Sequence, residues 1–287
     1  MQDCEVGVLG AGHMGRGIAA NYLRAGLPTG VYDVEPARMR EMAELDAELA
    51  ESPADLAAHC DLVSIVVRGE DHLETAAYGP DGLLARIRPG TVLVVHTSAQ
   101  PAYTRRLGER AAEHGARVVE AAMTGGMVGA AAGALTLMFA GDPVVVEEVW
   151  SKLRFVAKRR LYLGQLGAAG ICKAIQDTLF GLHHQTAHEM VQLAHAAGVD
   201  PDRLLEALIA KGWLLERWHE FWTSDGDEML GGRSQTTPRM PLKQFTPWLW
   251  QIADELGVDI TTSRETAARS ISILETQDWG GREYGGA

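Results

Sequence analysis

Three closely spaced glycines near the start of the chain constrain its fold more than any other feature. Gly10, Gly12 and Gly15 form Gly-x-Gly-x-x-Gly between a largely apolar segment at 4–9 and a helical pattern at 13–25. In such a turn the first glycine makes the tight bend, the second lets a pyrophosphate approach the backbone, and the third lets the helix pack against the strand. The helix N-terminus adds unpaired N–H groups and a partial positive charge. The segment therefore predicts a dinucleotide-binding unit.

An acidic residue about twenty positions further on indicates which dinucleotide is bound. Asp33 ends the second apolar segment, 29–33. A carboxylate there accepts hydrogen bonds from the adenosine ribose hydroxyls and repels a 2′-phosphate. The alternative is a solvated acid at a strand end, but the preceding glycines favour the cofactor role. Arg38 and Arg40 follow closely enough to reach a phosphate, yet the pattern favours NAD over NADP.

Four further residues are assigned to the cofactor site from their places in the pattern. His13 and Met14 belong to the glycine turn, whereas Val67 ends an apolar strand pattern and Thr97 follows another. In an open α/β sheet, ligands bind beyond the carboxyl ends of the strands, where these residues are expected. Thr97 would contact the nicotinamide ribose or ring. A capped helix start before Pro101 is the alternative for that segment.

Length and composition limit the classes of protein that the chain can be. With 287 residues it can form one large domain or two modest ones. The formal net charge of −12 argues against nucleic acid or anionic membranes as partners, so an anionic substrate needs locally placed cations. The chain shows neither a membrane-spanning apolar run nor a basic signal region at its start. Three scattered cysteines, Cys4, Cys60 and Cys172, indicate free thiols in a reducing compartment, so we expect a cytoplasmic protein.

Hydrophobic periodicity divides the chain into a first half, in which strands and helices alternate, and a second half that is helical. Strands are expected at 4–9, 29–33, 61–67, 91–95, 117–121, 134–140 and 160–163. Helices are expected between them at 13–25, 36–44, 81–87, 101–114 and 143–155, and later at 168–197, from Pro201 and at 242–256. Near-continuous apolar strands separated by helices indicate a parallel sheet covered on both faces. The fold class expected is α/β, with a Rossmann-type doubly wound parallel sheet in 1–163 followed by an all-α domain in 164–287.

Four further motifs follow the glycine turn in order. Residues 96–101 read His-Thr-Ser-Ala-Gln-Pro, residues 123–130 read Met-Thr-Gly-Gly-Met-Val-Gly-Ala, residues 164–173 carry three glycines before Lys173, and residues 242–245 read Leu-Lys-Gln-Phe. Together with the N-terminal pattern they resemble the β-hydroxyacid dehydrogenase family, which includes 3-hydroxyisobutyrate dehydrogenase. The resemblance spans nearly the whole chain. It implies a two-domain enzyme that transfers a hydride between NAD and a 3-hydroxy acid or related alcohol.

The resemblance makes Lys173 the catalytic residue. When a hydride leaves the carbinol carbon, the hydroxyl proton must leave too, so a base must contact the oxygen. Lys173 stands among apolar residues of a predicted helix, and burial lowers the pKa of a lysine toward neutrality, which suits alternating base and acid duty. The alternative is a surface lysine paired with Asp177 one helical turn on. The whole set of motifs favours catalysis.

The same resemblance places the substrate at a Thr-Gly-Gly segment and close to the lysine. Thr124, Gly125 and Gly126 would present a hydroxyl and backbone N–H groups to a carboxylate, because glycine lets an anion approach the main chain. A plain turn between strands is the alternative. The family has Asn-Asn three and four residues after its lysine, where this chain has Gln176 and Asp177. An ionised Asp177 would raise the pKa of the lysine and repel a nearby carboxylate, so these two residues are expected to tune specificity.

A lysine and a tripeptide also belong to the comparison with the family, and a pair of histidines raises the question of a metal site. Lys243 corresponds to a lysine that lies near the cofactor from the helical domain, with a solvated lysine as the alternative. Glu120-Ala121-Ala122 stands where the family has Asp-Ala-Pro. His184 and His188 lie one helical turn apart, but no carboxylate motif of a zinc site accompanies them, so no metal is expected.

Other functions remain open from the residues alone. An imine reductase on the same scaffold would reduce C=N with NADPH, but that group generally lacks the lysine, and Asp33 opposes NADPH. A phosphogluconate-type decarboxylation is disfavoured because His-Asn does not follow Lys173 at the required spacing. A dinucleotide-binding sensor would bind NAD(H) without turnover. The partners expected are a small carboxylate substrate and a second copy of the chain, since 168–197 is too apolar for exposure; a homodimer or dimer of dimers is expected.

Overall fold

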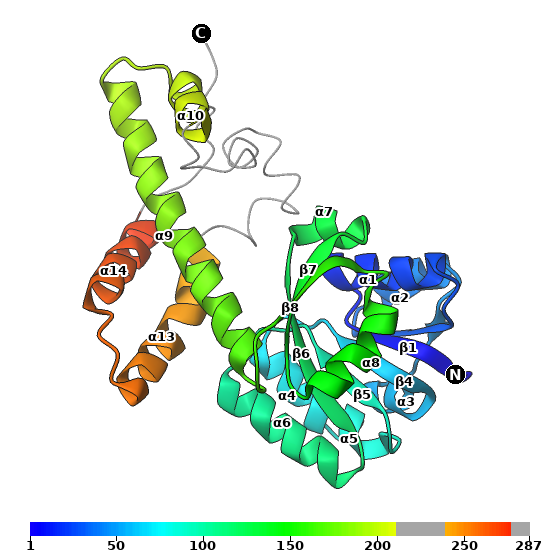
Figure 1. The fold of residues 1–287 in the computed structure, drawn as a ribbon. Helices are drawn as coiled ribbons and strands as arrows, with labels where there is room; N and C mark the ends of the chain where they lie inside the picture. Colours follow the sequence, from blue (N-terminus) through cyan, green and yellow to red (C-terminus); the bar gives the residue numbers. More distant parts are fainter. Residues whose placement is uncertain (211–238, 277–287) are drawn as a thin grey trace. The chain divides into compact units, whose positions relative to one another are not determined.

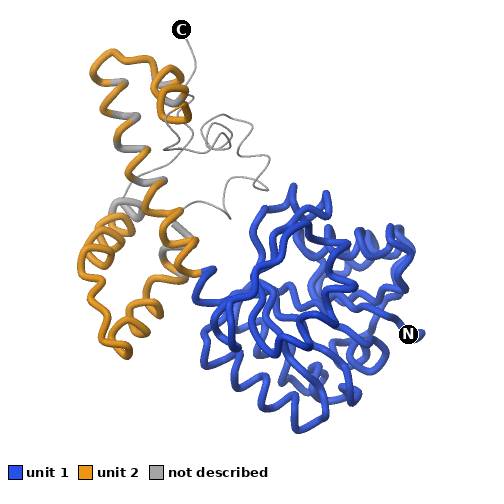
Figure 2. The backbone as a smooth tube through the Cα atoms, in the orientation of Figure 1, with its two compact units in different colours: residues 1–173 blue, residues 174–287 orange. Residues whose placement is uncertain are grey.

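The computed structural model describes residues 1–210 and 239–276, and the chain divides into two compact units, residues 1–173 and residues 174–287 (Figure 2). The first unit extends past residue 163, where the sequence pattern ends its first domain, because the next helix begins against the sheet. Ala169 is fully buried there in a cluster with Ala122, Met138 and Ala140.

An eight-stranded sheet forms the centre of the first unit (Figure 1). Its order is β3-β2-β1-β4-β5-β6-β7-β8, and all neighbouring strands are parallel except β6 and β7. The strands are β1 (Cys4–Leu9), β2 (Thr29–Tyr32), β3 (Glu48–Leu49), β4 (Cys60–Ile65), β5 (Val92–Val95), β6 (Arg117–Thr124), β7 (Leu135–Ala140) and β8 (Ala157–Tyr162). The outward run from β1 to β3, followed by a return to β4, is the doubly wound order of a Rossmann-type fold, which confirms the predicted fold class.

Helices cover both faces of this sheet. On β5, Val92 and Val94 point into one apolar cluster, whereas Leu93 and Val95 point into the other. The first cluster is closed by α1 (His13–Arg24), α2 (Pro36–Ala43), α7 (Gly126–Ala131) and α8 (Pro143–Leu153). The second is closed by α3 (Pro53–His59), α4 (Glu70–Tyr78), α5 (Leu83–Arg86) and α6 (Pro101–Glu113). Alternating burial of this kind explains the near-continuous apolar strands.

Several elements differ from those expected. The sequence pattern missed β3, α3, α4, α7 and the later helix α14 (Thr261–Thr276), and it ended the 117–121 strand too early. β6 continues to Thr124 because Met123 and Thr124 pair with Leu137 and Thr136 of the antiparallel strand β7. The strand predicted at 61–67 ends at Ile65, which leaves Val67 in the following loop.

The described part of the second unit is helical. α9 (Ala168–Ala196) leads into it and is followed by α10 (Pro201–Ala210), α13 (Arg239–Leu256) and α14 (Thr261–Thr276). Ala267 of α14 is fully buried against Leu182 of α9 and Trp250 of α13, so three helices share a small core. Across the described residues, none of the helices has the length and apolar character needed to cross a bilayer.

Candidate functional site

The carboxyl ends of β1, β2, β4, β5 and β6 lie at one edge of the sheet, since these strands are parallel. We call this the carboxyl edge. The strand order switches direction between β1 and β4, and open α/β sheets bind ligands beyond such a point. The loops here and the first turn of α1 carry most of the residues assigned to the cofactor from the sequence: Gly10, Gly12, His13, Met14, Gly15, Asp33, Val67 and Thr97.

The glycine turn has the geometry that its spacing predicts. Gly10 has φ +96°, and a Cβ on it would lie 2.4 Å from the carbonyl oxygen of Val66. A Cβ on Gly15 would lie 1.8 Å from the carbonyl oxygen of Gly10. Gly12 differs, because the nearest atom to an added Cβ is Nη1 of Arg38, 3.9 Å away. Gly10 and Gly15 are thus required by packing, whereas Gly12 leaves its backbone open to a ligand.

Gly17 is a further constrained glycine that sequence reasoning missed. A Cβ on Gly17 would lie 2.8 Å from the backbone carbon of Ala130, so α1 and α7 touch backbone to backbone. Asn21, one turn further on α1, donates from Nδ2 to the carbonyl oxygens of Gly17 and Ala130, at 2.7 Å each. Together these residues fix α7, and with it the Thr-Gly-Gly segment, against the dinucleotide-binding helix.

Asp33 is a buried carboxylate with defined partners, not a solvated acid. Its Oδ2 accepts from the N–H of Ala11 at 2.7 Å and its Oδ1 accepts from the N–H of Glu35 at 2.8 Å. Nη1 of Arg38 lies 3.3 and 3.4 Å from the two oxygens, and the Asp33 side chain is only 4% exposed. A carboxylate accepts about four hydrogen bonds, so Asp33 has acceptor capacity beyond its two backbone donors.

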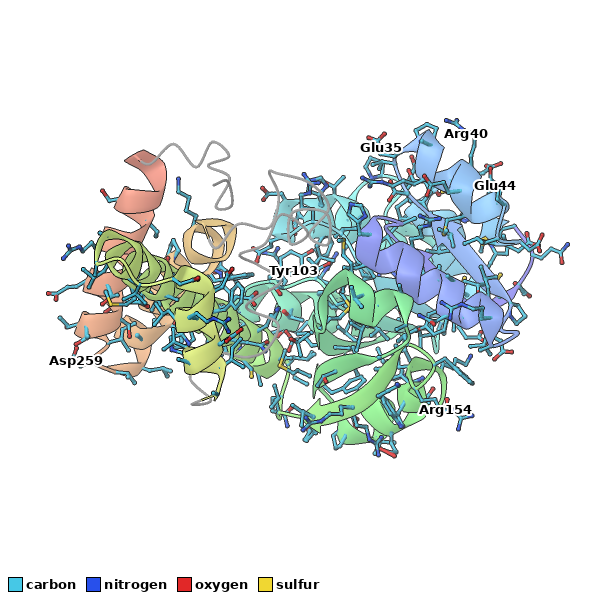
Figure 3. All side chains as sticks on the ribbon, turned by 90° about the horizontal axis from the view of Figure 1, so that it is seen from above. Glu35, Arg40, Glu44, Tyr103, Arg154 and Asp259 are labelled. Atoms are coloured by element: carbon cyan, nitrogen blue, oxygen red, sulfur yellow. The ribbon has the colours of Figure 1, made fainter. Side chains whose placement is uncertain are left out.

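Arg40, unlike Arg38, lies at the protein surface away from Asp33. It is exposed, and Figure 3 shows it with Glu35 and Glu44 at the outer surface around α2. Of the two arginines that the sequence places within reach of a phosphate, only Arg38 is in contact with Asp33.

Thr97 ties together the loops that follow β4 and β5. Its Oγ1 accepts from the N–H of Val67 at 3.0 Å and donates to the carbonyl oxygen of Val67, also at 3.0 Å. His96, just before it, is buried: Nδ1 lies 2.7 Å from the carbonyl oxygen of Ala121 and Nε2 lies 3.2 Å from Oγ of Ser64. Because a carbonyl only accepts, Nδ1 carries the proton. Burial lowers the pKa of His96 to about 4, so the ring is neutral at physiological pH.

The Thr-Gly-Gly segment lies at the end of β6. Thr124 is half-buried, and Gly125 and Gly126 have φ values of +127° and +62°. An added Cβ on Gly126 would meet nothing within 4 Å. Glycine is therefore required by backbone conformation rather than by crowding, and the exposed main chain of Gly126 is accessible to a ligand.

Lys173 belongs to the same unit as the cofactor loops and is half-buried on α9. Three residues earlier, Gly170 packs so closely on the loop after β5 that an added Cβ would lie 2.7 Å from the carbonyl oxygen of Ala99. The rise from Gly170 to Lys173 along the helix is about 4.5 Å. Gln176, exposed, and Asp177, half-buried, follow on α9 in the second unit.

Three further residues singled out from the sequence belong to the second unit. Lys243 is an exposed residue of α13 in the second unit. The side chains of His184 and His188 lie outside the described residues. Within the described residues, no cluster of three or more histidine, cysteine or acidic side chains could hold a metal ion.

Comparison with known proteins agrees with this geometry. Residues 5–164 match a family model described as the NAD binding domain of 6-phosphogluconate dehydrogenase. L-threonate dehydrogenase of Cupriavidus necator is 31% identical over 216 residues, which cover 74% of this chain and 73% of that protein. Among solved structures, 3-hydroxyisobutyrate dehydrogenase from Salmonella typhimurium has a TM-score of 0.82 and 24% identity over 95% of each chain. An imine reductase from Streptomyces aurantiacus has a TM-score of 0.67 and 18% identity, covering 95% of this chain and all of its own.

The two structural matches show the shared fold, and the family model and the L-threonate dehydrogenase carry the sequence relationship. The glycine turn, Asp33 and the ordered loops of the carboxyl edge lie within the matched residues. The chain belongs to the β-hydroxyacid dehydrogenase family, whose members are NAD(P)-dependent dehydrogenases that act on CH–OH groups.

Proposed function

We propose that the protein uses NAD to oxidise the hydroxyl of a 3-hydroxy acid to a carbonyl, and that it also catalyses the reverse reduction. Lys173 is the general base in the oxidation and the general acid in the reduction. One observation carries the proposal: Lys173 is half-buried about one turn beyond the point where α9 is docked on the loop after β5. That loop carries Thr97, at the edge where the dinucleotide loops gather. An amine in this place can reach a hydroxyl presented to the nicotinamide.

Asp33 supports NAD as the cofactor. Two backbone N–H groups hold its carboxylate in place, so it keeps its position when ribose hydroxyls displace the half-exposed Arg38. A 2′-phosphate would instead lie against a buried negative charge. His13, Met14 and Val67 border the same turn and Lys243 is assigned to the cofactor from the second unit.

The chemistry of the related substrates supports the substrate class. L-threonate and 3-hydroxyisobutyrate, which name two of the similar proteins, are both carboxylates with a hydroxyl on the third carbon. Thr124, Gly125 and the exposed main chain of Gly126 would hold such a carboxylate. Gln176 and Asp177, at positions where the family has two amides, would select among 3-hydroxy acids.

Proton transfer and substrate positioning are carried out by different residues. When bound, NAD accepts the hydride from the carbinol carbon. The Lys173 amine takes the hydroxyl proton as the C–H bond breaks, and the electron pair left by the O–H bond forms the carbonyl. The Thr-Gly-Gly segment keeps the substrate carboxylate fixed, which orients the carbinol hydrogen. In the reverse direction the ammonium returns the proton.

The fold is shared with imine reductases, so reduction of C=N with NADPH is the second candidate. Lys173 and Asp33 favour the dehydrogenase. We also propose a homodimer, because Ile175, Leu179 and Leu193 of α9 are about half exposed or more in the single chain. Free thiols at Cys4, Cys60 and Cys172 support the cytoplasm as its compartment.

The test is a substrate panel followed by absorbance of the reduced cofactor. 3-Hydroxyisobutyrate, L-threonate and other 3-hydroxy acids are assayed with NAD and NADP, and cyclic imines with NADPH. We expect turnover of a 3-hydroxy acid with NAD, and a loss of about 10²- to 10⁴-fold in kcat for Lys173→Met. Lys158→Met, at an exposed lysine of β8, is the matched control and should behave as wild type. Turnover of imines alone, or wild-type kcat in Lys173→Met, would contradict the proposal.

A further inference from the structure

A buried carboxylate of β6 is bonded to the start of α9. Glu120 is 3% exposed, and its Oε2 accepts from the N–H of Gly167 at 2.6 Å. Its other oxygen, Oε1, lies beside Gly170 in the first turn of α9, where an added Cβ would be 3.4 Å from it. Burial raises the pKa of Glu120, and the nearby N–H groups of Gly167, Ala169 and Gly170 act in the opposite direction. A side chain from the sheet thus holds the residue before α9, at the end of the helix where N–H groups have no partners within the helix.

Two glycines allow the close approach that this contact needs. A Cβ on Gly170 would lie 2.7 Å from the carbonyl oxygen of Ala99 and 3.4 Å from Oε1 of Glu120. Gly167 has φ +102°, and its Cβ would lie 2.7 Å from Cβ of Pro101. The glycines before Lys173 therefore let the start of α9 pack closely against Glu120 of β6 and against the chain at Ala99 and Pro101.

Lys173 depends directly on the placement of this turn. In an α-helix a side chain leans toward the helix N-terminus and covers the residues three and four positions before it. For Lys173 these are Gly170, which packs closely on Ala99 and Glu120, and Ala169, which is fully buried. Any shift of the first turn away from the sheet therefore moves the lysine amine by a similar amount.

Resting on the proposed function, we infer that Glu120 is a positioning residue for catalysis: it clamps the first turn of α9 to β6 and so sets where the Lys173 amine meets the reacting hydroxyl. A misplacement of about 1 Å at a reacting group can cost about 10²-fold in rate. The carboxylate is the suitable clamp because a charged acceptor bonds an N–H group more strongly than the neutral oxygen of an amide does.

The experiment compares Glu120→Gln and Glu120→Asp with Asp55→Asn. Asp55 is a matched control, because its carboxylate is also buried and accepts a backbone N–H, from Glu51 at 3.1 Å, but it belongs to α3. Each variant is assayed for kcat, for the Kd of NADH, and for the primary isotope effect with the fastest acid of the panel, deuterated on its carbinol carbon. Glu120→Gln should lower kcat by about 10- to 100-fold, raise the isotope effect, and leave the Kd within twofold.

Glu120→Asp keeps the charge but withdraws the carboxylate by one methylene, so kcat and the isotope effect should fall between those of wild type and Glu120→Gln. Asp55→Asn should match wild type in all three readouts. A purely structural role would lower kcat and NADH binding together and leave the isotope effect unchanged, which would overturn the inference. If Glu120→Gln does not fold, wild-type kcat and isotope effect in Glu120→Asp overturn it instead.

Lys173→Met separates this inference from the proposed function. Wild-type turnover by Lys173→Met overturns both. If Lys173→Met loses turnover but Glu120→Gln behaves as wild type, only the positioning role of Glu120 is overturned.

Discussion

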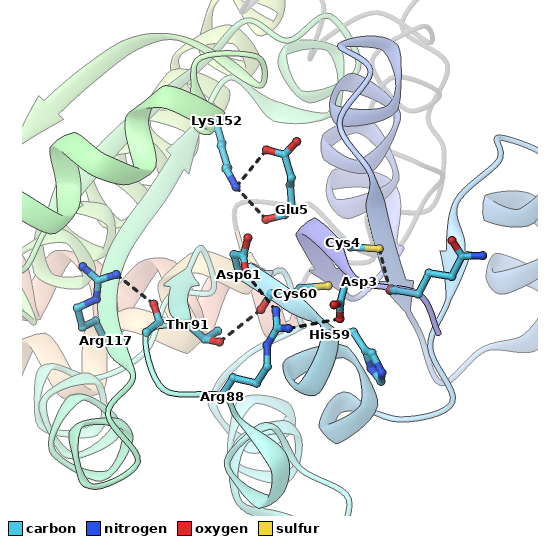
Figure 4. A network of polar contacts seen from close by, with 12 residues as sticks. Asp3, Cys4, Glu5, His59, Cys60, Asp61, Arg88, Thr91, Arg117 and Lys152 are labelled. Carbon is cyan, nitrogen blue, oxygen red and sulfur yellow. Dashed lines mark hydrogen bonds and ion pairs between the residues drawn. The ribbon is translucent and has the colours of Figure 1, made fainter.

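The two edges of the central sheet are built in opposite ways. At the amino edge, where the parallel strands begin, charged side chains join separate elements: Arg88 pairs with Asp3 at 3.3 Å and with Asp61 at 3.0 Å, and Lys152 pairs with Glu5 at 3.3 Å (Figure 4). At the carboxyl edge the connections are made by backbone groups, by glycines, and by the buried acids Asp33 and Glu120.

This difference has a physical reason. An exposed ion pair contributes about 0–1 kcal/mol, because water and salt compete with it. A buried acid that accepts backbone N–H groups is costly to remove, since the donors are left without partners. The amino edge therefore tolerates change, whereas the contacts of the carboxyl edge are costly to lose. The comparison predicts that substitutions at the two edges have effects of different size and kind.

The largest contrast lies within the glycine turn of the carboxyl edge. Gly15→Ala would force a Cβ to 1.8 Å from the Gly10 carbonyl oxygen, so we expect a loss of more than about 4 kcal/mol in the free energy of unfolding. Gly12 has φ −64° and room for a Cβ, so Gly12→Ala should keep the wild-type stability. It should raise the Kd of NADH at least about tenfold, because the methyl group occupies the pyrophosphate approach.

Urea unfolding and NADH fluorescence titration of both variants measure these two effects. Gly26→Ala is the control for backbone strain at a position away from the cofactor. Gly26 has φ +76° on an exposed turn, and an added Cβ would meet nothing within 4 Å. Unchanged NADH affinity in Gly12→Ala would show that the pyrophosphate does not approach there.

The second prediction concerns pH and the buried His96 of the carboxyl edge. Burial lowers its pKa to about 4, whereas an unfolded histidine titrates near about 6.5. Between these values the unfolded chain binds the extra proton, so stability is complete above about pH 6.5 and is lost as the pH falls toward 4, by about 3 kcal/mol in total. His96→Gln should remove much of this pH dependence.

Urea unfolding at pH 7.5 and pH 5 measures the change. His114→Gln, at an exposed histidine after α6, should retain the wild-type dependence. An equal loss of stability on acidification in wild type and His96→Gln would contradict the assignment.

The third prediction tests the Asp33–Arg38 pair. Asp33→Asn removes the negative charge and releases Arg38, so the ratio of NADPH affinity to NADH affinity should rise about tenfold, or about 1.4 kcal/mol. The double variant with Arg38→Gln should lose that gain. Arg40→Gln, on the outer surface of α2, should leave the ratio unchanged. Equal ratios in wild type and Asp33→Asn would show that this pair does not select the cofactor.

The residues that the sequence alone revealed are those under local constraint. Gly10, Gly12, Gly15 and Asp33 follow from the dimensions of one turn and one ligand, so their spacing is strict. The doubly wound order also follows from local patterns, because buried strands alternate with helices. The location of the carboxyl edge could therefore be predicted from the sequence.

The features that the sequence did not reveal depend on contacts between distant segments. Glu120 and Gly167 are 47 positions apart, and their bond exists only once α9 meets the sheet. The antiparallel direction of β7 is set by the short connection through α7, which returns the chain beside β6 without a full crossover. α3 carried start signals in Ser52 and Pro53 but is too short to show a helical period.

The smallest effect is expected at the amino edge, and it tests the comparison from the other side. Arg88→Ala removes both ion pairs, with Asp3 and Asp61, but the Arg88 side chain is 36% exposed and its partners more so. We expect a loss of at most about 1 kcal/mol in the free energy of unfolding, and less at 1 M salt, because screening weakens exposed pairs. The kcat and the Kd of NADH should match wild type, since open α/β sheets bind ligands at the carboxyl ends of their strands. Urea unfolding at two salt concentrations and NADH titration measure both. A change in NADH affinity would mean that the amino edge controls the loops at the opposite end of the strands, and the functional division between the two edges would be wrong.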